Sequence, residues 1–372
     1  MKINKVLAMF ITASIMSCGG GSESDPIATP KPTPTTPTPT TPSATTLKAA
    51  ATFPIGNIVS ASKLSGSDTN FTALLNKEFN SVTAENDMKM ASIFIGVNTY
   101  DFSKGDAIVA YAKANGIRVH GHALVWHSSI PTWLKNFTGT DAEFEAQVKG
   151  YIKATVAHFA IEKTAAGKSV VESWDVVNEA FTDGAYAGVF YKRIPNYLAK
   201  CFTWAREADA NVKLFYNDYN LESQGSKVTD VVNLVTSFKA NSTPIDGIGS
   251  QMHIDYQNPS LTTMTSNLNL LQSTGLLIHF SELDMTVNKD KVLSSLTSDR
   301  ANAQKAKYKE IAVLYKTIPA AQRFGITFWG LRDNKSWLIS FHNNSNEWPL
   351  LFDANNGYKA AYTGFLEGLN QK

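Results

Sequence analysis

Two glutamates each follow an apolar stretch that is typical of a buried strand. Glu179 comes after WDVVN at 174–178, and Glu282 comes after IHFS at 278–281. Cleavage of a glycosidic acetal needs one carboxylic acid to protonate the leaving oxygen and one carboxylate opposite the anomeric carbon. Carboxyl groups about 5–5.5 Å apart leave no room for water and require a double displacement with retention. We therefore take Glu179 as the candidate acid/base and Glu282 as the candidate nucleophile.

The two roles require different environments, because the acid must hold a proton near neutral pH while the nucleophile must stay ionised. His253 closes the predicted strand that precedes the strand of Glu282, and it is a candidate hydrogen-bond donor to that carboxylate. Asp284 is a candidate partner that orients the imidazole of His253. The alternative for His253 is a histidine that only satisfies polar groups at a strand end.

The elements that position these side chains form a regular alternation of strands and helices. Between the predicted strands, Thr140 and Glu143 have the spacing of a helical capping box. The segment Ile108 to Ala114 ends at Asn115-Gly116, a typical helix stop. Apolar and β-branched runs predict strands near Phe53–Ser60, Ser81–Glu85, Arg118–Trp126, Glu172–Asn178, Lys213–Asn217, Gly247–His253, Leu277–Glu282 and Gly325–Trp329.

Eight alternating units predict an α/β fold, a single (β/α)₈ TIM barrel with its active site at the C-terminal ends of the strands. A doubly wound sheet is the alternative, but it requires a glycine-rich loop after the first strand. The run Gly19-Gly20-Gly21 lies instead in the N-terminal tail. Polar or aromatic groups close the predicted strands at Glu85-Asn86, His122 with Trp126-His127, Asn178-Glu179, Asn217-Asp218, Gln251 with His253, Glu282 with Asp284, and Trp329.

Three buried positions are expected to be structural. Trp174 and Trp204 are expected in the core, and Cys201 is expected to be a buried thiol on a helical stretch. His120 is expected to point away from the barrel interior and to pack under the helices.

The N-terminal segment is typical of export. Lys2 and Lys5 precede an apolar run from Val6 to Met16, which suits a signal peptide and is too short to span a bilayer. Ile15-Met16-Ser17-Cys18 resembles a bacterial lipoprotein box. We therefore expect a lipoprotein signal peptide over 1–17 and lipidation of Cys18. An ordinary signal peptide cleaved nearby is the alternative.

Residues 18–46 are predicted to be a disordered linker, and residues 47–372 the catalytic domain. Within 26–46, seven of the fourteen prolines of the chain alternate with nine threonines, a composition that favours extended polyproline II and buries no core. The chain is then exported and anchored by lipid to a bacterial membrane, at the cell surface or in the periplasm.

Charge and cysteine content exclude several classes of partner. The formal net charge of +2 falls to zero once Lys2 and Lys5 are removed, and no run of Lys or Arg is present. Nucleic acid requires a basic stripe, so no nucleic-acid partner is expected. Two cysteines cannot form a four-cysteine zinc site. We expect no metal, no cofactor and a monomer.

Beyond the two glutamates, eight segments resemble family 10 glycoside hydrolases, the large family of retaining endo-β-1,4-xylanases. WDVVNEAF at 174–181 and SELDM at 281–285 are similar to its acid/base and nucleophile motifs. The similarity covers residues 53–365 and keeps the family's order. The other segments are TAENDMK (83–89), GHALVWH (121–127), LFYNDYN (214–220), GIGSQMH (247–253), FWGLRDNKSWL (328–338) and LLFDANNGYKAAY (350–362).

The resemblance implies endo-hydrolysis of β-1,4-xylosidic linkages in xylan and xylo-oligosaccharides. It implies that Asn178 hydrogen-bonds the 2-hydroxyl of the reacting sugar, and that His253, supported by Asp284, is the partner of the nucleophile. It also implies three sets of substrate-binding residues: Glu85, Asn86 and Lys89 on the glycone side, His122, Trp126 and Gln251 around the reacting sugar, and the aromatic pair Trp329 and Trp337.

Two positions depart from the family pattern. Met90 stands where an aromatic residue is frequent, and Ser129 stands where a glutamine that touches the second glycone sugar is frequent. Both departures point to weaker glycone binding and leave the chemistry intact. Two alternatives remain open at this level: an inactive sugar-binding barrel, and a β-1,4-glucanase or mixed xylanase/glucanase. Endo and exo action are not distinguished by the motifs.

Overall fold

The structure is a computed structural model that describes residues 44–181 and 188–371. The predicted signal peptide, Cys18 and residues 19–43 of the predicted linker lie outside the described residues. Within the described ranges, no helix combines the length and apolar composition needed to cross a bilayer.

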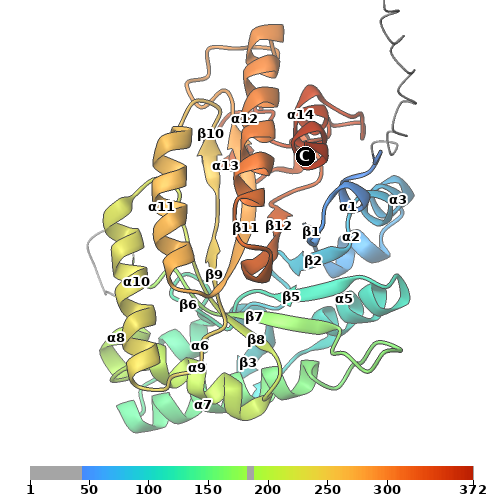
Figure 1. The fold of residues 1–372 in the computed structure, drawn as a ribbon. Helices are drawn as coiled ribbons and strands as arrows, with labels where there is room; N and C mark the ends of the chain where they lie inside the picture. The colour runs from blue at the N-terminus through green and yellow to red at the C-terminus, as the bar shows by residue number, and fades with distance from the viewer. Residues whose placement is uncertain (1–43, 182–187, 372) are drawn as a thin grey trace, which may run out of the picture. The chain divides into compact units, whose positions relative to one another are not determined.

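Eight parallel strands of the described chain form a closed ring, so the predicted (β/α)₈ barrel is confirmed (Figure 1). Each strand pairs with the next in chain order, and β12 pairs with β1 through Ile326 and Ile55, which closes the ring. The ring consists of β1 (Ile55–Val59), β2 (Ser81–Ala84), β5 (Arg118–Gly121), β7 (Val171–Asn178), β8 (Lys213–Asp218), β9 (Gly247–Ser250), β11 (Leu277–Thr286) and β12 (Arg323–Phe328).

A long helix follows every barrel strand and covers the outside of the ring (Figure 1). The helix after β12 ends beside the start of the domain, where the Asn370 side chain donates to the carbonyl of Ala44 at 3.0 Å. The long helices are α3 (Thr69–Glu78), α5 (Ser103–Ala114), α7 (Asp141–Phe159), α9 (Tyr197–Ala208), α10 (Gly225–Ala240), α11 (Leu261–Ser273), α12 (Ser298–Lys316) and α14 (Ala360–Asn370).

Shorter elements lie in the connections of the described chain. They are α1 (Leu47–Ala50), α2 (Ala61–Ser65), α4 (Met90–Ile93), the hairpin of β3 (Phe94–Gly96) and β4 (Thr99–Tyr100), β6 (Val125–Trp126), α6 (Thr132–Lys135), α8 (Val189–Arg193), β10 (His253–Asp255), the 3₁₀ helices η1 (Ala320–Gln322) and η2 (Asp333–Lys335), and α13 (Leu338–Phe341).

The helix α7 illustrates how local sequence sets these elements. Thr140 caps the helix, and its side chain and that of Glu143 exchange hydrogen bonds with each other's backbone amides, which confirms the predicted capping box. The apolar residues of α7, which include Phe144 and Ile152, are buried against the barrel. Helix α5 ends before Gly116, whose φ of 64° is the left-handed conformation that glycine adopts most readily.

Two predicted strands are split, and the splits matter for the site. The predicted strand 118–126 is interrupted after Gly121 and resumes as β6, where Val125 pairs with Val177 of β7. The predicted strand 247–253 ends at Ser250, and β10 begins at His253 beside Asp284 of β11. These interruptions turn side chains toward the barrel mouth, because an extra residue in one strand changes which face it presents.

The prediction for His120 is wrong. Its ring lies inside the barrel, 4.8 Å from the ring of His279 and 5.6 Å from that of Phe215, and its Nδ1 lies 2.6 Å from the hydroxyl of Ser173. Its Nε2 lies 3.0 Å from Asp175 Oδ2, the same oxygen that lies 2.8 Å from His122 Nδ1. His120 therefore fills the barrel beneath the site.

The expected core residues are confirmed. Trp174 is 1% exposed, Trp204 is 5% exposed and Cys201 is a buried free thiol. Gly121 is required beside Trp174, because a Cβ at this position would lie 2.3 Å from the indole ring. The strand that leads to Glu179 is thus packed closely against its neighbour.

Candidate active site

Glu179 directly follows β7, and two neighbouring strands hold its side chain. Trp126 at the end of β6 donates its indole N–H to Oε2 at 2.7 Å, and Gln251 after β9 donates its amide to Oε1 at 2.9 Å. The backbone amide of Glu179 donates to the carbonyl of Asn217 at 2.9 Å. The predicted residues Trp126, Gln251 and Glu179 therefore meet, although they come from three different strands.

Glu282 lies within β11 and not at its end, which corrects the predicted strand boundary. Beside it, β11 changes partner: Phe280 pairs with Ser250 of β9, and Asp284 pairs with His253 of β10. The change leaves Glu282 facing the barrel mouth, where it is 4% exposed. Its backbone amide donates to the carbonyl of Gln251 at 2.9 Å.

Two side chains hold the Glu282 carboxylate. Asn217 at the end of β8 donates to Oε1 at 2.8 Å, and His253 Nε2 lies 3.3 Å from Oε2. The other nitrogen of His253, Nδ1, lies 2.8 Å from Asp284, which is buried. Asp284 also accepts the indole N–H of Trp337 at 2.7 Å. The chain from Glu282 through His253 and Asp284 to Trp337 therefore fixes the orientation of the imidazole.

The electrostatics of these hydrogen-bonded residues favour an ionised Glu282. Burial by itself raises the pKa of Glu282, but the hydrogen bond from His253 and the attraction of nearby basic groups outweigh it and lower the pKa. Burial would lower the pKa of His253, yet the carboxylates of Asp284 and Glu282 raise that pKa well above its usual value. An imidazolium beside a carboxylate gives the arrangement that a nucleophilic glutamate needs.

Asn217 was noted in the sequence only as part of a polar strand end and was given no role. Its amide donates to Asn178 Oδ1 and to Glu282 Oε1, both at 2.8 Å, and its own oxygen accepts from Ser281 at 2.6 Å. Asn178 Oδ1 is thereby occupied by a donor from β8. The signal available in the sequence was its place at the end of β8, where Asn217 pairs with Asn178 of β7.

The predicted glycone-side residues gather beyond Trp126. Lys89 lies 4.8 Å above the Trp126 ring and donates to Asn86 at 3.0 Å. Burial lowers the pKa of Lys89, and the carboxylates around it only partly offset this effect. Glu85 pairs at 2.8 Å with Lys63, which the sequence motifs did not identify.

Two tryptophan rings lie beside His122 and His253, and Trp329 is 6.3 Å from the ring of His253. Trp329 directly follows β12, is 7% exposed and lies edge to face with His122 at 5.3 Å. Trp337 lies 5.0 Å from the ring of His253. His122 is anchored from below by Asp175, 2.8 Å from its Nδ1. The predicted pair of tryptophans therefore converges on His253, the partner of Glu282.

The two departures from the family pattern differ in their surroundings. Met90 begins α4 and is fully buried in the core, so its side chain offers no surface to a sugar. Ser129 is half-buried, and its amide donates to the carbonyl of Trp126 at 3.0 Å. Of the two, only Ser129 is placed to influence glycone binding directly.

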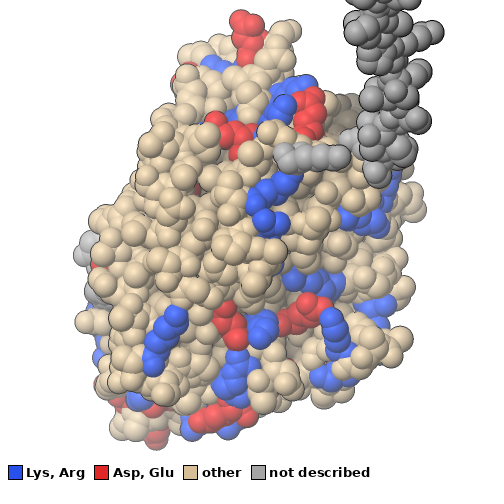
Figure 2. Space-filling view, in the orientation of Figure 1, with Lys and Arg blue, Asp and Glu red and all other residues tan. Residues whose placement is uncertain are grey.

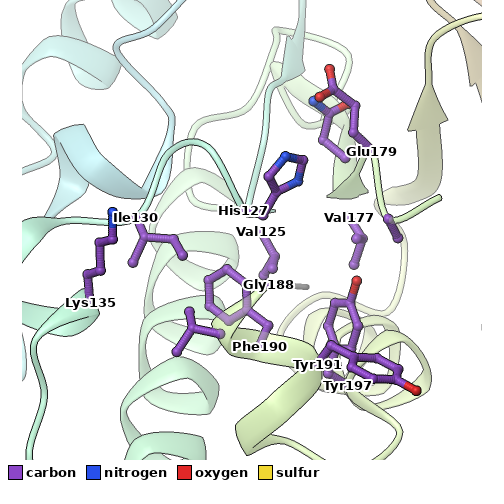
Figure 3. A pocket seen from close by; sticks show the side chains of 13 residues that line it. Val125, His127, Ile130, Lys135, Val177, Glu179, Gly188, Phe190, Tyr191 and Tyr197 are labelled. Carbon is purple, nitrogen blue, oxygen red and sulfur yellow. The ribbon is translucent and has the colours of Figure 1, made fainter. Parts of the chain in front are cut away.

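A pocket of about 300 Å³ borders Glu179 on the side of α8 (Figure 3). Val125, Val177, Phe190 and Tyr197 form much of its lining. Figure 3 shows the Glu179 carboxyl group at the rim, directed away from the rings of Phe190 and Tyr197. The pocket is therefore adjacent to the acid and separate from the groups that hold it.

Charges on the face seen in Figure 2 are mixed, with Lys and Arg side chains interspersed among Asp and Glu. Across the described residues, no group of three or more His, Cys, Asp and Glu side chains has the arrangement of a metal site.

Eight parallel strands form the ring, and buried Glu282 and half-buried Glu179 lie at its C-terminal mouth. This is the architecture of a barrel glycoside hydrolase. The model of the family described as Glycosyl hydrolase family 10 matches residues 44–368. The chain belongs to this family.

Characterised proteins of the family are similar over most of this chain. Endo-1,4-beta-xylanase A of Cellvibrio japonicus is 38% identical over 362 residues, which cover 87% of this chain and 56% of that protein. Endo-beta-1,4-xylanase Xyn10C of Cellvibrio japonicus is 36% identical, with 86% of this chain and 57% of that protein covered. The chain thus spans little more than half the length of these relatives.

A solved structure of a mutant xylanase 10C from Cellvibrio japonicus in complex with xylopentaose superposes with a TM-score of 0.80. It is 35% identical, and the superposition covers 88% of this chain and 70% of that one.

Proposed function

We propose that this protein hydrolyses internal β-1,4-xylosidic linkages of xylan with retention of configuration. The observation that carries the proposal is that the two glutamates differ in burial and in hydrogen-bond partners. Glu282 is buried among Asn217 and His253, whereas Glu179 is half-buried and held by Trp126 and Gln251. Family membership and the similarity to xylanases support xylan as the substrate.

In the first step, a Glu282 oxygen attacks the anomeric carbon while the glycosidic carbon–oxygen bond breaks. Glu179 transfers its proton to the departing oxygen, so the leaving sugar departs as a neutral alcohol. The lowered pKa of Glu282 keeps its carboxylate available for attack. The product of this step is a covalent ester between Glu282 and the sugar.

In the second step, water attacks the same carbon from the face that the leaving group has vacated. The Glu179 carboxylate accepts the proton of this water, and the ester bond to Glu282 breaks. Two inversions at one carbon give net retention. The amide of Asn178, whose oxygen is already engaged by Asn217, is free to bind the 2-hydroxyl, a contact that strengthens in the transition state.

The preference for xylose over glucose follows from the rigidity of the tryptophan pair. Glucose carries a hydroxymethyl group that xylose lacks. Trp337 is tied to Asp284 at 2.7 Å and packs near His253, so it resists the displacement that a larger sugar would require. Catalysis on β-1,4-glucan is the competing assignment.

Product profiles from xylan and from barley β-glucan test the proposal with the full chain. We expect xylan to give a mixture of xylo-oligosaccharides early in the reaction, with newly released reducing ends in the β configuration by NMR. Release of xylose or xylobiose alone would indicate exo action. Faster turnover of β-glucan, or α products, would overturn the assignment, and binding without turnover would indicate an inactive sugar-binding barrel.

We also propose that the chain is exported and anchored to a bacterial membrane through a lipid on Cys18. The support is the apolar run Val6 to Met16 followed by Ser17-Cys18, and the Pro/Thr-rich segment that would act as a spacer. In labelled cells, the wild-type chain should incorporate palmitate and sediment with membranes. Cys18→Ala should abolish the label and the sedimentation; an unchanged distribution would refute the anchor.

The protein is further proposed to act as a monomer. All the catalytic and substrate-binding residues that the family resemblance implies are present in this one sequence. Light scattering of the purified protein should therefore give the mass of a single chain, and activity per chain should not change on dilution.

A further inference from the structure

The backbone at Glu179 adopts a conformation that must be held from outside. Its φ is 56°, in the left-handed region that residues with a side chain seldom adopt. Such conformations persist where the surrounding structure over-determines them. The next two residues, Ala180 and Phe181, direct their backbone amides at a single acceptor, the hydroxyl of Tyr216, at 3.1 and 3.3 Å.

Tyr216 lies on β8 and is fully buried. Its hydroxyl donates to Asp218 Oδ2 at 2.5 Å, which leaves the oxygen lone pairs for the two amides. Because residues 216 and 218 are two positions apart on one strand, both point to the same face. The direction of the hydroxyl is therefore set by Asp218 and not by the turn that it supports.

Asp218 is itself held from helix α10. Lys227 Nζ lies 2.7 Å from Asp218 Oδ1, and both side chains are buried. The backbone amide of Tyr219 also donates to Oδ1 at 2.9 Å. A buried ion pair is costly to break once formed, because the remaining charge is left without a partner. The pair therefore gives Tyr216 a fixed support.

Strand β8 consequently accepts the backbone amides of Glu179 and of the two residues that follow it. The carbonyl of Asn217 accepts the amide of Glu179, and the hydroxyl of Tyr216 accepts the next two amides. We propose that Tyr216 is a positioning residue for proton transfer: its hydroxyl, oriented by Asp218 and Lys227, fixes the turn at 179–181 and so aims the Glu179 carboxyl at the leaving oxygen. This inference rests on the proposed function of Glu179.

The proposal has a chemical consequence that a purely structural role lacks. Proton transfer needs heavy atoms about 2.6–3.2 Å apart. A displacement of about 1 Å can slow a reaction about a hundredfold. Removing the hydroxyl of Tyr216 takes away the acceptor of the Ala180 and Phe181 amides and loosens the turn. The loss should therefore depend on how strongly the leaving group needs a proton.

The test is Tyr216→Phe in the full chain, measured on two substrates. One is xylohexaose, whose leaving alcohol needs protonation, and the other is a dinitrophenyl xylobioside, whose leaving group does not. We expect kcat/KM on xylohexaose to fall about 10- to 100-fold and kcat/KM on the aryl substrate to stay within about twofold. Glu179 must also activate water in the second step, so hydrolysis of the covalent intermediate should slow. On the aryl substrate, kcat and KM should then fall by similar factors, and a burst of dinitrophenol should precede the steady state.

A matched control is Tyr315→Phe. Tyr315 is also buried, accepts the amide of Gly325 at 2.7 Å and donates to the carbonyl of Ile278 at 2.8 Å, but it lies at the opposite end of the barrel strands. It should lose thermal stability without any leaving-group dependence. Equal losses on both substrates for Tyr216→Phe, or no loss on either, would overturn the proposal.

Asp218→Asn provides a second variant if Tyr216→Phe does not fold. It should show the same dependence on the leaving group with a smaller magnitude, and a uniform effect would count against the inference. Measurements on wild type and Glu179→Ala distinguish a failure of the positioning role of Tyr216 from a failure of the proposed function. If wild type does not cleave xylohexaose, or Glu179→Ala shows no leaving-group dependence, the proposed function fails; if they behave as expected and Tyr216→Phe resembles Tyr315→Phe, only the positioning role fails.

Discussion

The side-chain amide of Asn217 lies 2.8 Å from Oε1 of Glu282, and the same nitrogen lies 2.8 Å from Oδ1 of Asn178. One donor from β8 thus joins the nucleophile to the side chain that directly precedes the acid. Gln251 extends the connection, because its amide contacts Glu179 at 2.9 Å and Asn178 at 3.4 Å. The two glutamates are therefore held by a continuous set of amide side chains.

Asn217→Ala should lower kcat/KM on xylo-oligosaccharides about 10- to 100-fold, because Glu282 loses a buried donor and Asn178 loses its support. Removing a donor to the carboxylate also raises its pKa, so the acid limb of the pH profile should move to higher pH. Asn211→Ala, on the exposed turn before β8, is the control and should resemble wild type. A variant with normal kcat/KM would remove Asn217 from the site.

Glu282→Ala should abolish turnover of xylan, because the variant lacks the carboxylate that forms the covalent intermediate. Azide can enter the space of the lost carboxylate and attack an activated aryl xylobioside directly. A single displacement then yields an α-glycosyl azide, with inverted configuration, which NMR identifies. Turnover of xylan by this variant in the absence of azide would refute the assignment of the nucleophile.

Glu179→Ala should slow cleavage of xylan by a factor of about 10²–10⁴, the usual contribution of a general acid. An aryl xylobioside with a dinitrophenolate leaving group should keep most of its kcat/KM. Azide should then accelerate the second step and give a β-glycosyl azide, since the covalent intermediate still forms. Equal losses on both substrates would contradict the acid role.

His253→Ala should change how the rate depends on pH. In the wild-type protein, the hydrogen bond and charge of His253 lower the pKa of Glu282 against the effect of burial. Without them the pKa of Glu282 rises, and a larger share of Glu282 is protonated in weak acid. The acid limb of kcat/KM should therefore shift to higher pH, which a pH series on an aryl xylobioside measures; an unshifted limb would exclude this coupling.

The same variant should also lose stability, and this loss should be largest at acidic pH. The pKa of His253 is raised in the folded protein, so the folded state binds the proton more tightly than the unfolded chain. This contribution is fully present below the unfolded pKa near 6.5 and disappears as the pH rises through the folded pKa. Chemical unfolding should show His253→Ala less stable than wild type at pH 6, with the difference narrowing in alkali.

Ser129→Gln should lower KM on short xylo-oligosaccharides and leave kcat nearly unchanged. The longer amide extends from a half-buried position beside Trp126, where it can reach a sugar on the glycone side. A contact that stabilises the bound substrate and the transition state equally changes KM more than kcat. Ser128→Gln, at the exposed neighbouring position, is a matched control, and identical KM values for both variants and wild type would remove the argument.

Much of the architecture was predictable because it is encoded locally. Hydrophobic runs, the capping box at Thr140 and the helix stop at Gly116 depend on neighbours in the chain. The capping box and the helix stop are confirmed. The runs located all eight barrel strands, although two of the predicted strands are split and one extends further. Polar clusters at the strand ends also marked Glu179 and Glu282. The chemistry of a paired acid and nucleophile follows from residue types and strand order alone.

Side-chain partners across strands were decided only by the tertiary structure. Glu282 faces the barrel mouth because β11 exchanges β9 for β10 beside it, an irregularity that hydrophobic periodicity does not reveal. His120 fills the barrel, where it contacts the same Asp175 oxygen as His122, and the face that a strand residue presents depends on strand register. Asn217 reaches Glu282 across 65 residues. Such contacts arise when separate strands close into one ring, and no local pattern determines their direction or distance.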